Sequence, residues 1–454
     1  MMNKKIAAIL LSLCLPTSLA QAYRTDGQGG VYSFYRLSQT EGSGVTMEIK
    51  DGKKNYTLSQ NDTISAGDTF EGSESCIVYF ADKVTFVVEG KADFQGKGSV
   101  TYAAKDDADG AVGICLDNNE ESTNFGGCTF VGVGVKFKGK SGGTLHSCTF
   151  TGNNSSIGQA ALILGDSDDE YVVSHCRFRE NRKAAISSAA NIFSKVVIEH
   201  SEFLQNGTDN GNTPQLNLTA SDKVEIVNCD IIGAPEHNMV GGIGISNFFG
   251  TSGNSITINN CRIRENRYGI GTVGPMDISI AKCDIINNSY ETNPMNGGSG
   301  ISLYDPYMKT TAVISDNIIE RNLWGVTIIG CKDVNLGCID LGENYNHGGN
   351  WFINNGNNDQ PYDLYNNSTN TIYAQGNLWN TGPQTEEEIE KVVFHKHDNP
   401  SLGEVIYWPA HYGTDIRQAK TETEDKPTVY RLDGIQLPGL QKGLNIVHGK
   451  KVVR

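Results

Sequence analysis

The sequence lacks three features that would narrow its function quickly: cysteines with metal-type spacing, basic clusters and long apolar runs. Its 11 cysteines form no CxxC pair and no Cys/His spacing of the zinc-binding kind, which excludes a structural zinc site. After residue 22 no apolar run approaches the length of a transmembrane helix. We therefore expect the mature chain to be soluble and without a membrane span.

Positive charge is scarce as well. The formal net charge is −15, and no basic run interleaved with aromatics occurs in the body of the chain, which excludes nucleic acid as an expected partner. An acidic exterior keeps an exported protein soluble, and it disfavours polyanionic ligands unless there is a local basic groove. Glycine, in contrast, is plentiful at 52 residues, as a chain of many tight turns requires.

One short pattern recurs along the chain: a small residue, a Phe or Ile two places on, and in most copies an asparagine five places on. In the central copy these are Cys261, Ile263 and Asn266, whereas two copies carry Val133 and Ala234 in place of the asparagine. A recurrence at a loose period of roughly 20 to 35 residues is typical of stacked repeat proteins. The Phe or Ile positions of the nine copies are Phe130, Phe150, Phe178, Phe203, Ile231, Ile263, Ile285, Ile319 and Phe352.

Short alternating segments flank the pattern. Residues 256–258 (Ile-Thr-Ile) precede the central copy and residues 268–273 follow it, and period-2 alternation indicates short strands with one buried face. Three such strands per repeat, separated by Gly, Asn and Ser turns, predict an all-β parallel β-helix, a solenoid whose asparagines stack at one corner. A leucine-rich repeat is the alternative, but it needs a more constant period and leucine-rich spacing, and this chain has neither.

Residues 1–22 predict a signal peptide. Lys4 and Lys5 supply a positive start, residues 6–20 an apolar stretch, and residues 20–22 (Ala-Gln-Ala) a small-residue cleavage site. A buried first strand is the alternative interpretation. The signal predicts an exported protein.

Export makes disulfides chemically feasible, yet six cysteines share one position of the repeat. Ser201 and Asn317 occupy the same position in other copies, so the site accepts a small inward side chain. This equivalence favours a ladder of mostly free thiols over a disulfide framework. The six residues are Cys128, Cys148, Cys176, Cys229, Cys261 and Cys283.

The chain divides into five expected segments. After the signal, residues 23–127 should supply an N-terminal β cap and the first irregular coils, because exposed strand edges invite pairing with other chains. Residues 128–411 should form the β-helix with its C-terminal closure. Residues 412–427 are polar and charged, as in a linker, and residues 428–454 form a short β tail.

An acidic loop between two strand-like segments is a candidate metal site. Its carboxylates are those of Asp166, Asp168, Asp169 and Glu170. Oxygen-rich loops of this kind can hold calcium, which is the cofactor that the sequence suggests. A solvated turn is the commoner use of such a loop.

Four arginines fall on the outer face of the repeats, offset from the inward positions: Arg177, Arg179, Arg262 and Arg264. Stacked coils would align them in a charged ladder. This ladder is either part of a groove for sugar acids or an exposed salt-bridge network.

The longest loops, residues 233–239 and 288–299, can wall a groove. Tyr304 and Tyr307 follow the second loop, and tyrosine rings suit sugar stacking, although they can also simply pack the loop. These two tyrosines and the four arginines are the candidate substrate-binding residues. No residue is assigned a catalytic role.

The segment after the last coil resembles the C-terminal closure of bacterial right-handed β-helix proteins of the pectate-lyase-like superfamily. The matching parts are a turn ending at Trp379, a short helix within residues 386–393, and the Asp-x-Pro-Ser-Leu-Gly run of residues 398–403 before Pro409. The resemblance covers residues 372–409 closely and the coils from residue 128 in general pattern. It implies a right-handed helix, and it implies that His395, His397 and Asp398 are structural.

Enzymes of that superfamily eliminate or hydrolyse acidic polysaccharides, and some proteins on the same fold only bind. The Arg-x-Pro-x-x-Arg base segment of pectate lyases is absent here, as are the paired-aspartate and Gly-His-Gly segments of polygalacturonases. Two functions therefore stay open. One is a polysaccharide lyase or glycoside hydrolase, and the other is a non-catalytic, adhesin-like surface protein. Association with a polysaccharide or surface glycan is favoured.

The last 27 residues resemble the C-terminal sorting signal of the Bacteroidetes type IX secretion pathway. The resemblance is carried by Leu-Asp-Gly at residues 432–434, Lys-Gly-Leu-x-Ile-Val at 442–447 and Gly-Lys-Lys-Val-Val at 449–453. It implies that secretion machinery is a partner of residues 428–454 and that the protein is secreted or held at the outer cell surface. A final β-hairpin docked on the helix is the alternative.

Overall fold

The computed structural model describes residues 22–95, 100–106, 112–117, 121–154, 159–188, 194–250, 253–340 and 342–411, together with four short strands of the tail. The predicted signal peptide lies outside these residues except for Ala22. The chain separates into two compact units, Met1–Ala410 and His411–Arg454. No helix among the described residues is long and apolar enough to span a membrane.

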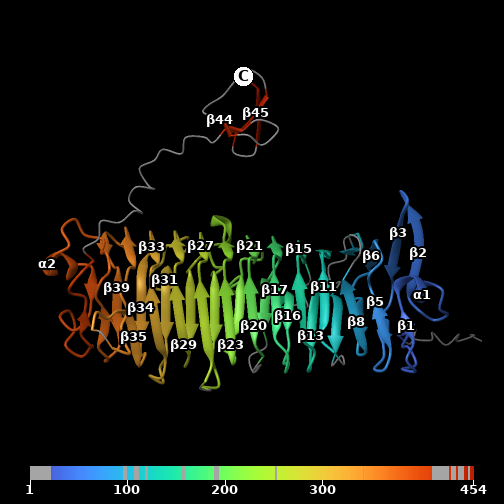
Figure 1. The fold of residues 1–454 in the computed structure, drawn as a ribbon, viewed down its shortest axis with the longest axis horizontal. Coiled ribbons are helices and arrows are strands. Elements are labelled where there is room, and N and C mark those ends of the chain that lie inside the picture. The colour runs from blue at the N-terminus through green and yellow to red at the C-terminus, as the bar shows by residue number, and fades with distance from the viewer. Residues whose placement is uncertain are drawn as a thin grey trace, which may run out of the picture. The chain divides into compact units, whose positions relative to one another are not determined.

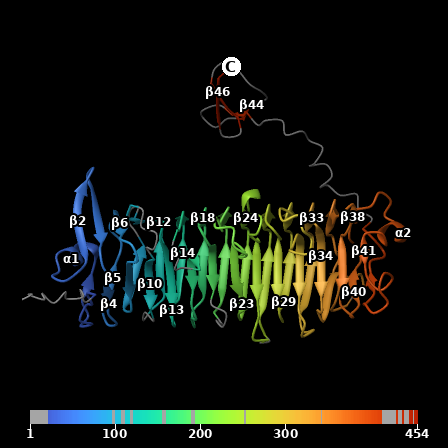
Figure 2. The same ribbon diagram turned by 180° about the vertical axis from the view of Figure 1, so that it is seen from behind.

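The first unit is a right-handed parallel β-helix, as the sequence predicts. Its strands form three long sheets, here called A, B and C, and the chain visits C, A and B in turn on each coil (Figures 1 and 2). Within these three sheets the strands pair in parallel with the equivalent strands of the next coil, except for an antiparallel hairpin at the N-terminal end of sheet C. The resulting body is elongated, with the coils stacked along its length.

Sheet A contains β4 (Thr63–Ile64), β7 (Thr85–Val88), β10 (Gly113–Asp117), β13 (Gly134–Lys138), β16 (Ala160–Leu164), β19 (Ala184–Ser188), β22 (Leu216–Thr219), β25 (Ile243–Ser246), β28 (Ile270–Val273), β31 (Ser299–Tyr304), β34 (Trp324–Ile329), β39 (Leu364–Asn367) and β41 (Val393–Phe394). Sheet B contains β1 (Val31–Tyr32), β5 (Thr69–Glu71), β8 (Lys91–Gln95), β11 (Thr123–Gly126), β14 (Gly143–His146), β17 (Tyr171–Ser174), β20 (Val196–Glu199), β23 (Lys223–Val227), β26 (Ser255–Asn259), β29 (Asp277–Ala281), β32 (Thr311–Ser315), β35 (Asp333–Gly337), β40 (Ile372–Ala374) and β42 (Val405–Ile406).

Sheet C contains β2 (Val45–Lys50), β3 (Lys53–Leu58), β6 (Cys76–Phe80), β9 (Val100–Ala104), β12 (Thr129–Val131), β15 (Thr149–Thr151), β18 (Arg177–Arg179), β21 (Glu202–Leu204), β24 (Asp230–Ile232), β27 (Arg262–Arg264), β30 (Asp284–Ile286), β33 (Ile318–Glu320) and β36 (Trp351–Ile353). Because β3 to β11 already belong to these sheets, regular coils extend well upstream of Cys128. The remaining elements of this unit are α1 (Phe34–Ser38), a 3₁₀ turn (Pro235–His237), β37 (Gly356–Asn357), β38 (Gln360–Pro361) and α2 (Glu386–Ile389).

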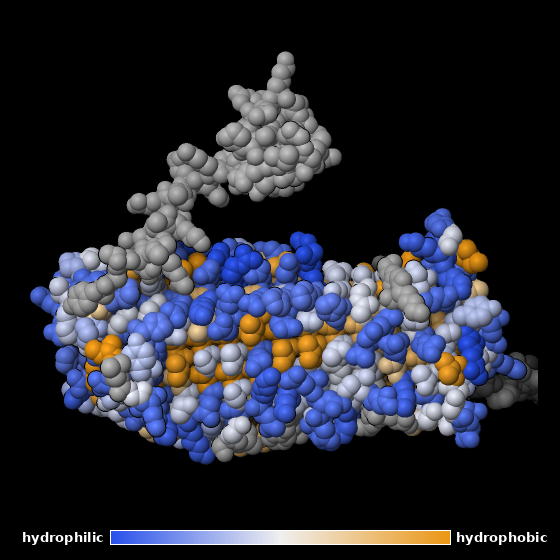
Figure 3. Space-filling view, viewed as in Figure 1, coloured by the Kyte–Doolittle hydropathy of each residue, from blue (hydrophilic) through white to orange (hydrophobic). Residues whose placement is uncertain are grey.

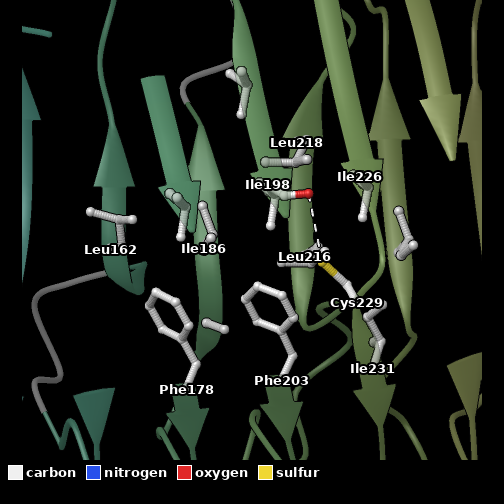
Figure 4. Packing of buried hydrophobic residues seen from close by; sticks show 14 of the residues in the cluster. Leu162, Phe178, Ile186, Ile198, Phe203, Leu216, Leu218, Ile226, Cys229 and Ile231 are labelled. Atoms are coloured by element: carbon white, nitrogen blue, oxygen red, sulfur yellow. Dashed lines mark hydrogen bonds between the residues drawn. The ribbon is translucent and has the colours of Figure 1, made fainter. Parts of the chain in front are cut away.

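The Phe or Ile of the repeat points into the core in all nine copies, and none of the nine side chains is more than 1% exposed. Equivalent rings stack from coil to coil, with Phe150 and Phe178 at 4.6 Å between centroids and an interplanar angle of 3°. Figure 4 shows Phe178, Phe203 and Ile231 continuing one row, with the Cys229 sulfur directed at the Ile198 carbonyl. The register proposed from the sequence is therefore confirmed.

Left-handed residues form both corners of the sheet C strands. In the coil of Cys261, Asn260 (φ 53°) precedes the inward cysteine and Glu265 (φ 59°) precedes the inward Asn266. A left-handed residue turns the chain sharply and costs least in Gly, Asn and Asp, but other residue types such as Glu265 hold this conformation here as well.

The small-residue position of the repeat is a hydrogen-bonding site as well as a packing site. The Cys261 thiol lies 3.4 Å from the Ile226 carbonyl oxygen, while the Ser201 hydroxyl accepts the Cys176 N–H at 3.0 Å. Asn317 Oδ1 likewise accepts the Cys283 N–H at 2.9 Å. All six repeat cysteines are free thiols, as the ladder interpretation requires.

The repeat asparagines form a buried ladder in which one amide bonds to the next. Asn181 Nδ2 donates to Asn206 Oδ1 at 2.7 Å, and Asn266 Nδ2 donates to Asn288 Oδ1 at 3.1 Å. Where Ala234 interrupts the pattern, Gln215 bridges the gap: its Oε1 accepts from Asn206 Nδ2 at 2.9 Å and its Nε2 donates to Asn266 Oδ1 at 3.0 Å.

Each end of the stack is covered. Helix α1, capped by the Ser33 hydroxyl, inserts Phe34 against Phe70 at 4.9 Å between ring centroids. At the other end Trp379 stacks on Phe352 at 4.9 Å, and Ile389 of α2 is fully buried. The face of the body shown in Figure 3 is mainly hydrophilic, with an apolar stripe along its middle part.

The tail unit contains β43 (Val429–Tyr430), β44 (Gln436–Leu437), β45 (Leu444–Val447) and β46 (Lys450–Val453). They form one antiparallel sheet in the order β44-β43-β45-β46. The described part of the tail thus has its own sheet.

Candidate functional site

A cleft of about 630 Å³ runs across the outer face of sheet A. Its floor follows a single register through six consecutive strands, β22, β25, β28, β31, β34 and β39. At a strand spacing of about 4.8 Å, six strands span about 24 Å along the helix axis. The residues of this floor row are Asn217, Gly244, Gly271, Ser302, Thr327 and Tyr365.

The floor is hollow because its middle positions are small. The inward neighbours of the row, such as Ile270 and Ile301, are fully buried, so alternation directs the row outward. A Cβ on Gly244 would stand 2.7 Å from Pro214, and one on Gly271 would stand 3.0 Å from the Tyr268 ring. Glycine at these places therefore lets Tyr268 lie on the floor.

The loop before β31 forms one wall. Arg267 holds it by donating from Nε to the Asn296 carbonyl oxygen at 2.6 Å, and Trp324 holds it by donating from Nε1 to the Pro294 carbonyl oxygen at 3.2 Å. Between these two anchors Met295 is 87% exposed at the rim. The wall is thus fastened to the coil on each side of it.

Aromatic side chains from several coils line the cleft. Tyr268 and Trp324 stand at equivalent positions two coils apart, with Ser299 between them. Trp324 packs on Tyr362 at 4.6 Å and meets Tyr365 edge-on at 5.1 Å between centroids. Two rings separated by a small residue provide apolar faces that a ligand can contact.

Hydroxyl and amide groups supply the polar part of the lining. Among the described residues that line the cleft, none is Asp, Glu, His or Lys, and Arg267 carries the one charged side chain. Burial raises the pKa of Tyr268 to about 12, an effect that Arg267 partly offsets. Tyr268 is therefore a neutral phenol at physiological pH. The hydroxyl and amide residues are Asn212, Asn217, Ser246, Thr272, Asn296, Ser299, Ser302 and Thr327.

Of the two loops expected to wall a groove, residues 288–299 do so, contributing Pro294 to Gly297. Tyr304 lines the cleft at the end of β31 and is 40% exposed, whereas Tyr307 lies three residues beyond it and is 58% exposed. Loop 233–239 contributes only the Met239 carbonyl oxygen, which accepts from Arg267 at 3.5 Å.

The four candidate arginines lie on sheet C and face away from the cleft. Arg177 pairs with Glu202 at 2.6 Å, and Arg264 pairs with Asp284 at 3.0 Å. Arg179 contacts Glu180 at 3.1 Å, and Arg262 forms an ion pair with Asp230. Their geometry is that of an exposed ion-pair ladder.

The acidic loop is tied to neighbouring side chains. Lys140 contacts Asp166 at 2.9 Å and Asp168 at 3.4 Å, and Ser122 donates to Asp169 at 2.6 Å. Glu170 pairs with Lys223 at 3.2 Å. The four carboxylates are thus held by three different side chains, Lys140, Ser122 and Lys223.

Glu390, His395 and His397 bring three ligand-type atoms together in the C-terminal closure. However, His395 Nδ1 accepts the Val405 N–H at 2.9 Å, so in the neutral ring Nε2 carries the proton and donates to Glu390 at 3.1 Å. A nitrogen that carries a proton cannot ligate a metal ion. The Glu390 carboxylate accepts from both histidines and from Tyr407 at 2.6 Å, which lowers its pKa despite partial burial. The cluster has the geometry of a structural closure.

Sequence reasoning missed Arg267, Tyr268, Trp324 and Tyr365 as lining residues. The signal that could have found them is the run of small residues at outward positions of sheet A. Gly244 lies between the inward Ile243 and Ile245, and Gly271 follows the inward Ile270. A glycine at such an outward position leaves room for a ligand or for a neighbouring ring.

Comparison with known proteins gave few matches. No protein-family model and no curated protein matches the sequence. Solved structures of the periplasmic alginate epimerase AlgG are similar to this chain. The wild-type structure is 11% identical, covers 84% of this chain and 84% of its own, and has a TM-score of 0.48. A double mutant of it is 12% identical, with 85% and 84% covered and a TM-score of 0.45. A likeness at this level says nothing of what this chain binds.

Proposed function

We propose that the protein binds a polysaccharide in the cleft on sheet A and does not cleave it. The observation that carries this proposal is the lining: aromatic rings beside amides and hydroxyls, in an open row about six strands long. Pyranose rings present apolar C–H faces and peripheral hydroxyls, so this combination matches both parts of a sugar. The sequence also left open a non-catalytic surface protein. That alternative is compatible with this proposal if the role of the surface protein is to bind a glycan.

Cleavage is disfavoured by the chemistry of the lining. Hydrolysis needs a carboxylate pair, and elimination needs a base together with a group that stabilises the developing charge. The described lining offers no carboxylate or histidine. Tyr268 stands beside Arg267, but its raised pKa keeps it protonated, so it is a poor base near neutral pH.

A binding screen combined with a product assay tests both halves of the proposal. Purified protein is run in native gels that contain one soluble polysaccharide each, and the same mixtures are assayed for new reducing ends and unsaturated sugars. We expect retardation by at least one polysaccharide and no product. Catalytic product formation would contradict the non-cleaving role, and no retardation in any gel would contradict glycan binding.

We also propose that the protein is exported by the signal at residues 1–22 and carried beyond the periplasm through residues 428–454, which the secretion machinery would recognise. The tail has its own sheet, and it ends in Lys450, Lys451 and Arg454 with no acidic residue after Asp433. A basic tip on an acidic protein suits recognition by a partner.

Deletion of residues 428–454 tests this second proposal. Because the tail is a separate compact unit, the melting temperature should stay nearly unchanged while the protein accumulates in the periplasm. Arrival of the truncated protein at the surface or in the medium would refute the sorting role. Unfolding of the β-helix on deletion would show that the tail is part of the fold.

A further inference from the structure

This inference rests on the glycan-binding role proposed above and concerns which class of glycan the cleft binds. The charge of the cleft lining distinguishes neutral from acidic chains. We propose that the ligand is an uncharged, extended polysaccharide that lies parallel to the helix axis, and not a polyuronate or a sulfated chain. The inference rests on the shape of the floor, the charge of the lining and the surroundings of Arg267.

The floor sets the direction and length of the ligand. Its six residues come from six consecutive coils, so a chain that follows this row runs along the axis. One sugar unit of an extended chain is about as long as the strand spacing of about 4.8 Å. The floor therefore accommodates several units in succession.

Such a chain would bring several negative charges if its units were uronates. The described lining offers one cation, Arg267, and no carboxylate that would share a calcium ion with a uronate. The remaining uronates would exchange water for neutral hydroxyl and amide donors, with no cation to balance their charge. The net charge of −15 adds repulsion at longer range.

Arg267 is itself engaged by neutral groups. Its Nε donates to the Asn296 carbonyl oxygen at 2.6 Å, and its Nη1 donates to Asn212 Oδ1 and to the Met239 carbonyl oxygen. These bonds fasten the wall loop. Nη2 makes no hydrogen bond within the described part of the chain, and it can donate to a sugar hydroxyl.

The aromatic positions favour an uncharged chain as well. Trp324, Tyr365 and Tyr268 present apolar surface, and Pro214 and the Tyr268 ring cover the backbone at Gly244 and Gly271. A neutral pyranose loses little on leaving water for such a surface because its hydroxyls lie at the ring edge, within reach of Asn217, Ser302 and Thr327.

Paired polysaccharides test the inference. Affinity gels or titration calorimetry would compare soluble neutral chains (xylan, mannan and mixed-linkage glucan) with polygalacturonate and alginate. We expect binding of at least one neutral chain, with a Kd that changes less than about twofold between about 50 and 500 mM salt, because no ion pair is screened. We expect no binding of either polyuronate.

Two variants make the test independent of which neutral chain is chosen. Asn217→Arg with Thr327→Arg places two cations on the floor, and this double variant should gain salt-sensitive binding of polygalacturonate. The matched control, Thr257→Arg on β26, adds one cation on sheet B and should gain none. Melting curves check that all variants fold.

The outcomes separate this inference from the binding role itself. If the wild-type protein binds a polyuronate and Trp324→Ala loses that binding, the proposal of a neutral ligand is wrong, while the cleft is still the binding site. Failure of the cationic double variant to gain polyuronate binding would also overturn the charge argument. Binding of no glycan, neutral or acidic, would overturn the proposed function.

Discussion

The buried ladder of asparagine side chains should lose stability when its glutamine, Gln215, is truncated. Gln215 replaces the asparagine that the repeat lacks at Ala234. Its side chain accepts from Asn206 Nδ2 at 2.9 Å and from the Asn206 backbone N–H at 3.1 Å, and it donates to Asn266 Oδ1 at 3.0 Å. All three amide side chains are at most 1% exposed, so water cannot replace the lost bonds without a cavity.

Truncation by Gln215→Ala should therefore destabilise the β-helix. Asn206 Nδ2 keeps its bond to the Phe178 carbonyl oxygen at 3.1 Å, but the Asn206 N–H and Asn266 Oδ1 lose their partners. An unsatisfied buried polar group costs about 1 to 3 kcal/mol, so two such groups should cost about 2 to 6 kcal/mol.

Urea unfolding followed by circular dichroism measures this loss. The matched control is Gln360→Ala on β38, an exposed glutamine, which should change the unfolding free energy by less than about 0.5 kcal/mol. The rescue variant adds Ala234→Asn to Gln215→Ala and restores the amide that other coils carry at this position. Recovery of at least half of the lost stability is expected. If Gln215→Ala matches wild type, or the rescue gives nothing, the ladder does not stabilise the stack as argued.

Three further predictions concern the core and its chemistry. Ile285→Ala should lower the unfolding free energy by about 2 to 5 kcal/mol, because the side chain is fully buried in the stacked row, and a loss under about 0.5 kcal/mol would refute that register. Alkylation of denatured protein without reductant should label all six repeat cysteines in mass spectra, and protected residues would indicate disulfides. Burial raises the pKa of Asp363 to about 7, so the folded state binds a proton that the unfolded chain releases near its ordinary value. Stability should accordingly fall as pH rises from about 4 to about 7, and Asp363→Asn should remove this part of the pH dependence; an unchanged profile would contradict it.

The fold was largely predictable because its signals are local and repeated. Phe178 and Ile263 stand at fixed offsets from a cysteine and an asparagine, so the inward row can be read from spacing alone. For the small-residue position of the repeat, the packing role was predictable from the sequence and the hydrogen-bonding role was not. Packing explains why Cys176 and Ser201 are equivalent, but the bond from the Cys176 N–H to the Ser201 hydroxyl appears only when the coils are stacked.

The cleft was less predictable because its residues come from six different coils. The length of the loop at residues 288–299 predicted a wall of the cleft. The position of Tyr304 close after that loop predicted a lining residue. Nothing in the spacing showed that Tyr268 and Trp324 stand at the same level two coils apart, since the number of residues in a coil varies with its loops. The arginines on β18 and β27 were singled out from composition, but three of the four pair with acidic residues on neighbouring coils of sheet C, and Arg179 pairs with the adjacent Glu180.

The most direct test of the central claim is the Kd of Trp324→Ala for the polysaccharide that the wild-type protein binds, measured by titration calorimetry. Loss of a central aromatic contact is worth about 2 kcal/mol, so binding should weaken roughly thirtyfold. Tyr373→Ala, which removes a 40% exposed ring on β40 of sheet B, is the control and should bind as wild type does. Equal affinities of Trp324→Ala and wild type would contradict the claim that the cleft on sheet A is the binding site.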